Sequence, residues 1–480
     1  MYTWILTCCP CHSLSSTNPG TPHYLLLDAC AYSGSLTPEQ QKINSEEGGL
    51  TYQIQEDDSF GEAVARLGDL DGNGAVDFAV GNGYMKEETG SVFIIFLNPD
   101  NTVLKETRIG NSDDGESTVG GLASLLPEYA YFGTAVGCLG DLDRDRVPDL
   151  IVGADGDDEE GGALYVLFLL ATGEVKNQQR ISATEGGLGA FVTLDDNVGY
   201  FGTDLGVIGE LDESGTVSVV VGTGSDELYH VRINGDGTVG NAKSLYLAGG
   251  REGAGGVADI GDVDGNGFVD IAVGAPDADR GRGGVYVLLM GEGDTVLGEQ
   301  LIASQSGGLG ELSKWFYFGY HIDGVGDLDG DGIPDIAASI PDAEPWNDAE
   351  WGAGAVYILL LTETGSVKDF NIISPDTGLI GPVVAGDNFG GGGIATLVER
   401  EDSEQGVVKL VVGAWNDGSS AVSGGALYVL TCKIVRRGGG ATLLFSLPVV
   451  ECITNLQCIV LMALTWVLVL VGVLVVVWVK

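Results

Sequence analysis

A pattern that recurs at least five times constrains the fold of this 480-residue chain more than any other feature of its sequence. The clearest copy starts with Phe60-Gly61, runs through LGDLDGNGAVDFAVG and ends in the apolar run SVFIIFL from Ser91. Further copies are recognised at Phe132, Phe201, Ile260, Phe318 and Phe389, and the last of these has lost the acidic loop. The small residues that close the strand after the loop lie 52 to 74 residues apart, at Gly81, Gly153, Gly222, Gly274, Ser339 and Gly413. This spacing is typical of a propeller blade and too long for a solenoid turn.

Each unit contains four short β segments, with alternating and β-branched residues and no helix-length amphipathic pattern. In five units an aromatic residue of the third segment and the last apolar residue of the fourth are 16 residues apart, which predicts a hairpin of fixed length. The pairs are Phe93 and Ile109, Tyr165 and Ile181, Tyr229 and Leu245, Tyr286 and Ile302, and Tyr357 and Ile373. One such sheet exposes both faces, and stacking several around an axis buries them. The sequence therefore predicts an all-β fold, a β-propeller of four-stranded blades over residues 23–432.

The run from His23 to Ile43 resembles the aromatic hairpin of the other units, although Tyr24 and Ile43 are 19 residues apart. We interpret it as the second half of a blade whose first half is missing or supplied from elsewhere. Six units and this half unit fit either six or seven blades. The sequence does not decide how the ring closes.

Charge limits the partners of the chain. It carries 69 acidic and 22 basic residues, a formal net charge of −47, which excludes nucleic acid as a main partner because phosphate binding needs a basic face. Glycine supplies 78 residues, and the many turns of a propeller account for most of them. The eight cysteines form no recognisable disulfide framework.

Four units carry an acidic loop of the form D-x-D-x-[DN]-[GR]-x-x-D. Their candidate side-chain ligands are Asp69, Asp71, Asn73 and Asp77; Asp141, Asp143, Asp145 and Asp149; Asp262, Asp264, Asn266 and Asp270; and Asp327, Asp329, Asp331 and Asp335. The seventh residues, Ala75, Val147, Phe268 and Ile333, would each offer a backbone carbonyl. Converging carboxylates repel one another unless a cation lies between them, and a set of oxygen ligands alone favours Ca²⁺ over zinc. The sequence therefore predicts about four calcium sites.

Two other interpretations of the loops fit the sequence less well. An EF-hand needs a glutamate at position twelve, where this chain has the strand residues Val80, Val152, Val273 and Ala338. Metal-free turns also favour Asp and Gly, but a turn does not need four ligand positions at fixed spacing four times over. The third unit has Glu210, Asp212, Ser214 and Ser218 instead, and we expect that site to be weak or empty.

Phe-Gly, the acidic loop and endings such as Gly274-Ala275-Pro276 together resemble the FG-GAP repeats of the integrin α-subunit head. The resemblance implies a β-propeller whose calcium loops lie between the first two strands of a blade, and a role in recognising protein or matrix outside the cell. Integrin α chains continue into long leg domains, whereas only about 25 residues separate Cys432 from Cys458. This difference argues against an integrin β-type partner.

The two ends of the chain differ from the repeats. Residues 458–479 carry no charge and as a helix would span about 33 Å, enough for a membrane core of about 30 Å, so they predict a transmembrane helix after a linker of residues 433–457. The orientation of the propeller has two opposing indications. Basic residues before the span favour the cytoplasm, namely Lys433, Arg436 and Arg437. Acidic loops of the class found in extracellular calcium-binding modules favour an extracellular propeller, which we prefer. A lipid-anchor signal is the alternative. Residues 1–22 form an uncertain N-terminal segment with a poor match to a signal peptide.

Enzyme signatures are absent, so we expect a binding protein. His230 and His321 lie in strand patterns, and the GxGxxG match at residues 235–240 lies inside a hairpin and opens no helix. A ligand surface or ordinary packing explains an aromatic cluster at Trp315, Phe316, Tyr317, Trp346 and Trp351. The sequence thus predicts a membrane-anchored, extracellular, calcium-binding propeller that binds a protein, matrix or glycan ligand in adhesion or recognition. A lectin-like carbohydrate binder and a propeller polysaccharide hydrolase or lyase remain open as alternatives.

Overall fold

The chain divides into two compact units, Met1–Leu36 and Thr37–Lys480. The computed structural model describes residues of the second unit only. They are residues 40–445 without 56–57, 85–88, 111–125, 158–160, 194–198, 210–214, 225–226, 246–254, 314–315, 342–351, 376–382, 385, 398–406, 419–423 and 438–439.

Five four-stranded antiparallel sheets follow one another along the chain, each with its strands in sequence order. Blade 1 comprises β2 (Val64–Gly68), β3 (Asp77–Asn82), β4 (Ser91–Leu97) and β5 (Val103–Gly110), and blade 2 comprises β6 (Val136–Gly140), β7 (Asp149–Ala154), β8 (Ala163–Leu169) and β9 (Val175–Ile181). Blade 3 comprises β10 (Leu205–Ile208), β11 (Thr216–Gly222), β12 (Leu228–Asn234) and β13 (Val239–Leu245), and blade 4 comprises β14 (Val257–Gly261), β15 (Asp270–Gly274), β16 (Gly284–Gly291) and β17 (Thr295–Ala303). Blade 5 comprises β18 (Ile322–Gly326), β19 (Asp335–Ile340), β20 (Ala355–Leu361) and β21 (Val367–Ile373). The short helical turns η2 (Leu188–Ala190) and α2 (Ala278–Gly281) lie in connections.

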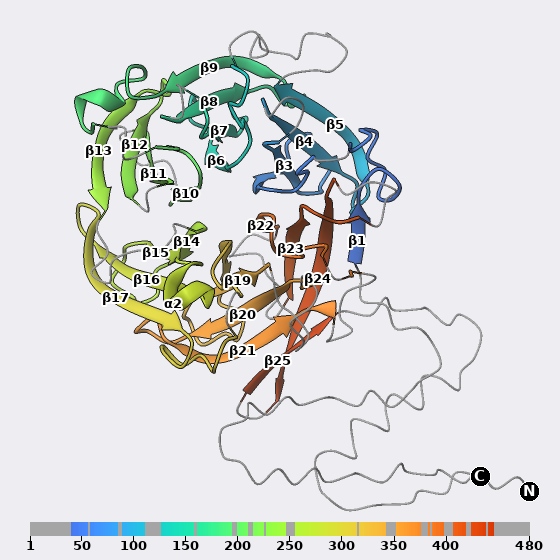
Figure 1. Ribbon diagram of the computed structural model, residues 1–480, viewed down its shortest axis with the longest axis vertical. Helices are drawn as coiled ribbons and strands as arrows, with labels where there is room; N and C mark the ends of the chain where they lie inside the picture. The colour runs from blue at the N-terminus through green and yellow to red at the C-terminus, as the bar shows by residue number, and fades with distance from the viewer. Residues whose placement is uncertain are drawn as a thin grey trace, which may run out of the picture. The chain divides into compact units, whose positions relative to one another are not determined.

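The sixth blade joins the two ends of the repeat region. Its inner strands are β22 (Ile394–Thr396), β23 (Val407–Ala414) and β24 (Ala426–Arg437), and β1 (Gln40–Ile43) pairs with β24 as the outer strand. The strand β25 (Gly440–Phe445) pairs with the later part of β24. The first strands of the six blades adjoin in cyclic order, so the ring has six blades and is closed (Figure 1).

Of the half unit predicted at the N-terminus, the described residues 40–43 form one strand of this blade. Ile43 is paired with Leu427 and Lys42 with Tyr428, the register that Ile109 and its neighbour keep in blade 1. The aromatic strand next to Ile43 is thus β24, far along the chain, in which Tyr428 lies opposite Lys42. Tyr24 lies outside the described residues.

The apolar core lies between neighbouring blades. Six clusters of buried residues each combine side chains of two adjacent blades, and the last combines the sixth blade with the first, for example Val411 and Leu427 with Phe78 and Phe93. A sheet that exposes two apolar faces thus buries both against its neighbours, as the strand pattern required.

The Phe-Gly motif links the blades. Its phenylalanines are fully buried at Phe60, Phe132, Phe201, Phe318 and Phe389. Each packs against the aromatic residue of the third strand of its own repeat, with ring centroids 5.5 to 6.1 Å apart. Their backbones pair with the preceding blade, as Phe132 does with Gly90, and the Phe60 N–H donates to the Gly424 carbonyl at 3.1 Å to close the ring.

Within the described residues, no helix is long and apolar enough to cross a membrane. The predicted transmembrane segment, residues 458–479, and the N-terminal segment, residues 1–22, lie outside those residues.

Candidate metal centres

The four acidic loops occupy equivalent hairpins between the first and second strands of their blades. We call them loop 1 (residues 69–77), loop 2 (residues 141–149), loop 4 (residues 262–270) and loop 5 (residues 327–335). Each follows a glycine with positive φ, Gly68, Gly140, Gly261 or Gly326, at which the register of the hairpin shifts. Such a bulge bends the strand and aims the following residues out of the sheet.

Left-handed backbone positions shape the loops. The sixth position is Gly74, Gly267 or Gly332, with φ of 88 to 91°, which confirms the sharp turn expected there. Loop 2 has Arg146 in the same conformation at φ 74°, a geometry that costs a side-chain-bearing residue roughly 1–2 kcal/mol. The loop geometry is therefore kept even where the sequence lacks glycine.

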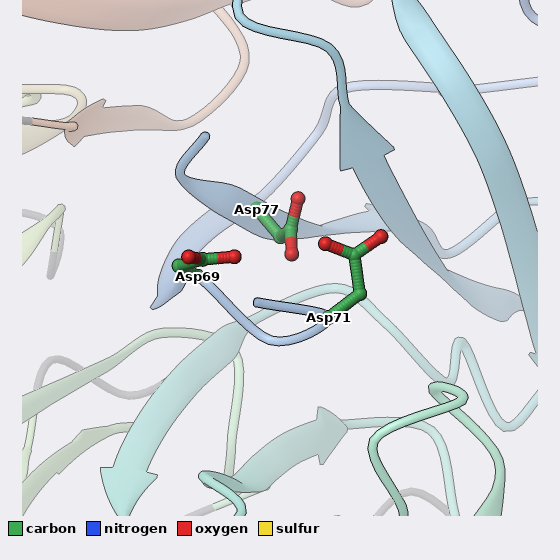
Figure 2. Close-up of side chains that lie close together, drawn as sticks. All are labelled: Asp69, Asp71 and Asp77. Carbon is green, nitrogen blue, oxygen red and sulfur yellow. The ribbon is translucent and has the colours of Figure 1, made fainter. Parts of the chain in front are cut away.

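Three carboxylates of each loop converge. In loop 1 one oxygen each of Asp69, Asp71 and Asp77 lie within 4.8 Å of one another, and Figure 2 shows the three groups facing a common space. The other loops bring together the first, third and ninth positions in the same way: Asp141, Asp143 and Asp149; Asp262, Asp264 and Asp270; and Asp327, Asp329 and Asp335. At that separation each pair of charges repels by about 3.5 kcal/mol at an effective dielectric constant of ~20. The four clusters can hold metal ions, because a cation between the carboxylates removes this repulsion.

The ninth aspartate has a structural role that the sequence did not reveal. Asp77 is fully buried, and its two oxygens accept the backbone N–H groups of Leu70 and Leu97, each at 2.9 Å. The same double contact recurs at Asp149, Asp270 and Asp335. These aspartates therefore tie each loop to the end of the third strand, in addition to facing the cluster.

Burial makes the charged form of these aspartates unfavourable. It raises the pKa of Asp77 to about 6, and the carboxylates of Asp71 and Asp69 raise it further, against the lowering effect of the two backbone donors. Burial likewise raises the pKa of Asp149 and of Asp335 to about 7 and raises that of Asp270. A cation in contact with the cluster would favour the charged form instead.

The fifth position organises the turn. Asn73 Oδ1 accepts the N–H of Ala75 at 2.7 Å, and Asp145, Asn266 and Asp331 accept the equivalent N–H. Nothing in the described contacts tests the seventh-position carbonyls, so their part in a ligand set stays a prediction. Of the third loop, Glu210, Asp212 and Ser214 lie outside the described residues, and Ser218 lies in β11.

Two carboxylate oxygens bear on whether the loops suit a metal ion, namely Asp141 Oδ1 and Asp329 Oδ1. Both are buried and have no hydrogen-bond partner among the described atoms. Buried acceptors are normally satisfied, so each of these two oxygens can still take a ligand such as a cation. All the side chains that converge in the four loops offer oxygen, which suits a hard cation.

Several other candidates from the sequence have structural explanations. Residues 235–240 form the turn between β12 and β13 and the first two residues of β13, which confirms that the glycine-rich match is a hairpin. Phe316 packs against the core between blades 4 and 5, whereas Trp315, Trp346 and Trp351 lie outside the described residues. His321 is enclosed, and its Nε2 lies 3.2 Å from the Gly391 carbonyl oxygen. Burial lowers the pKa of His321 to about 4.

A closed six-bladed propeller with acidic loops in the first hairpin of four blades defines the class of protein. No family model matches the chain. Integrin alpha-3 of Cricetulus griseus is 30% identical over 187 residues, which cover 36% of this chain and 16% of that protein. Integrin alpha-11 of Homo sapiens is 27% identical over 168 residues, which cover 34% of this chain and 12% of that protein. Integrin alpha pat-2 of Caenorhabditis elegans is 24% identical over 355 residues, covering 73% of this chain and 22% of that protein.

The matched part is thus less than a quarter of each of these relatives. Among solved structures, a complex of BBS1N with ARL6DN aligns with 76% of this chain at 11% identity and a TM-score of 0.37, which supports no further comparison. The repeats, the six-bladed ring and the sequence relatives together identify the chain as an integrin α-like propeller of FG-GAP repeats.

Proposed function

We propose that the chain is an extracellular recognition or adhesion module whose propeller is stabilised by calcium and which residues 458–479 anchor in a membrane. The observation that carries the calcium part is the convergence of three carboxylates in each of four equivalent loops. The recognition role rests on similarity to proteins named integrin alpha.

The loop residues can bind a cation at the point where two strands of a blade meet. The first and third aspartates would contact it from the loop, and the ninth would contact it from the start of the second strand. Bound calcium supplies positive charge that offsets the repulsion among these carboxylates. The ninth aspartate already joins the loop to the third strand, so binding would stiffen three of the four strands of a blade.

Thermal melting of the full-length chain with calcium and with a chelator tests this stabilisation. Calcium at 100 times its dissociation constant adds about 2.7 kcal/mol per site, so chelation should lower the melting temperature. Asp329→Ala should remove one calcium from the bound count. Glu363→Ala, which removes an exposed charge from the turn between β20 and β21, is the matched control and should leave the count unchanged. A melt that does not respond to the chelator would refute the metal proposal.

A second experiment addresses recognition. The purified chain is applied to an array of matrix proteins and glycans, and each bound glycan is then incubated with it and analysed for cleavage products. Binding to matrix protein without cleavage supports the adhesion role. Selective glycan binding would favour the lectin alternative, and cleavage products would favour the hydrolase or lyase. The same preparation, analysed for co-purifying subunits, tests the expectation that no integrin β-type subunit is bound.

Membrane anchoring is tested separately. The complete chain should sediment with membranes and resist alkaline extraction, whereas a chain lacking residues 458–479 should not. Protease added to intact cells should digest the propeller if it faces outward. Recovery of the complete chain in the soluble fraction would contradict the anchor.

A further inference from the structure

The four acidic loops are of two kinds, which differ at the fifth position. Loops 1 and 4 have Asn73 and Asn266 there, and the amide of each donates to a backbone carbonyl at the end of the third strand. The acceptors are the carbonyl oxygens of Leu97 and Met290, each at 2.8 Å. Loops 2 and 5 have an aspartate at this position, which cannot donate such a bond when ionised.

Both aspartate loops contact a lysine from the fourth strand of their blade. Lys176 Nζ lies 2.6 Å from Asp143 Oδ2 and also contacts Asp145. Lys368 Nζ lies 2.8 Å from Asp329 Oδ2 and also contacts Asp331. In each case the ammonium joins the third and fifth positions of the loop.

The lysine occurs only where the fifth position is aspartate. The register of the outer hairpin aligns Val103, Val175, Val296 and Val367 at the same place in the four blades. The residues that follow these valines are Leu104, Lys176, Leu297 and Lys368. The two leucines are 50% and 67% exposed, so burial does not require an apolar residue at this position.

The exchange keeps the charge of the clusters constant. Loops 1 and 4 have three aspartates among their four ligand positions, a charge of −3. Loops 2 and 5 have four aspartates and one contacting lysine, and −4 + 1 is again −3. Arg144 and Arg146 of loop 2 are exposed and form no ion pair with these carboxylates among the described contacts, and loop 5 has glycine at both places.

The lysine does not complete the aspartate loops. The buried oxygens without a partner, Asp141 Oδ1 and Asp329 Oδ1, belong to loops 2 and 5. Asp141 is at the first position of its loop, where both oxygens of Asp69, Asp262 and Asp327 accept backbone N–H groups in the other loops, whereas Asp329 is at the third position. The loops that contain a lysine therefore still offer an oxygen to a further cation.

We propose that Lys176 and Lys368 are tethered cations that hold loops 2 and 5 in order without metal and weaken calcium binding there to the level of the asparagine loops. The inference rests on the calcium binding proposed above. A divalent cation that binds the same carboxylates must either displace the lysine ammonium or be repelled by its positive charge. Each pair is partly exposed, and such a pair typically changes an equilibrium by about threefold, so the two pairs of one lysine together correspond to roughly tenfold.

The test uses the full-length chain with Lys368→Met, because loop 5 has no neighbouring arginine. Titration against a chromophoric chelator should show one of the bound calcium ions held about tenfold more tightly, and melting in excess chelator should occur at a lower temperature than for the wild type. Lys176→Met should do the same for loop 2. Lys105→Met is the control, because the Lys105 ammonium lies over the Phe96 ring rather than on a loop carboxylate, and it should change neither calcium affinity nor the number of ions bound.

A charge exchange in blade 1 keeps the inference testable if a lysine variant does not fold. Asn73→Asp should tighten calcium binding by loop 1, and adding Leu104→Lys should return the affinity to the wild-type value. Wild-type calcium binding together with unchanged affinity and an unchanged chelated melt in the lysine variants would overturn the inference and leave calcium binding intact. A wild-type chain that binds no calcium would overturn both.

Discussion

A buried ion pair, which a single substitution can remove, lies where the ring closes. Lys42 of β1 lies 2.6 Å from Asp417, with side chains 7% and 1% exposed, and the Tyr428 hydroxyl donates to the same carboxylate oxygen at 2.6 Å. The ammonium also lies over the Tyr428 ring at 5.2 Å from its centroid. Lys42 therefore joins β1, which precedes the repeats, to the connection between β23 and β24.

Lys42→Met keeps the aliphatic stem and removes the charge. Breaking a buried pair destabilises by about 3–5 kcal/mol, and we expect the lower end because Tyr428 still supports the carboxylate. An unfolding entropy of about 2.1 cal/mol/K per residue over roughly 400 residues turns ~3 kcal/mol into a shift of about 4 °C in melting temperature. Differential scanning calorimetry measures the shift, and hydrogen exchange of residues 40–43 reports whether β1 separates from β24.

Blade 2 provides a matched control. Arg180, Asp157 and Tyr165 form the same arrangement there, but the hairpin between β8 and β9 keeps the outer strand in place. Arg180→Met should lower stability without faster exchange at residues 40–43. Adding Asp417→Asn to Lys42→Met should recover part of the lost stability. Unchanged melting and unchanged exchange of β1 in Lys42→Met would refute the view that this pair secures the closure.

Two further predictions concern blade contacts and pH. Gly81→Ala should destabilise the fold by several kcal/mol, because the added Cβ would lie 1.9 Å from the Gly133 carbonyl oxygen. Gly222→Ala should be tolerated, because the nearest atom to its Cβ would be 3.5 Å away. Thermal melts of both variants check this. Burial raises the pKa of Glu62 from 4.5 to about 7, so its stabilising contribution is complete below about pH 4.5 and is lost as pH rises through 7. Glu62→Gln should therefore melt higher than the wild type at pH 8 and show a flatter pH profile, and equal profiles would contradict this.

The repeat sequence was sufficient to predict the blades and the loops. Four strands per unit, the hairpin of fixed length and the place of the acidic loops between the first two strands all follow from patterns that are local in sequence. A loop such as residues 69–77 carries its own turn residues and its own carboxylates, so its geometry depends little on distant parts of the chain.

Contacts between distant residues were decided by the tertiary structure. The pairing of β1 with β24 and the contact of Lys42 with Asp417, 375 residues away, have no local signal, which is why the sequence left six and seven blades open. The anchoring of Asp77 to Leu97 and the contact of Lys368 with loop 5 likewise depend on which strands lie side by side. Local periodicity specifies each blade, whereas closure and the environment of each carboxylate arise only when the sheets pack around the ring.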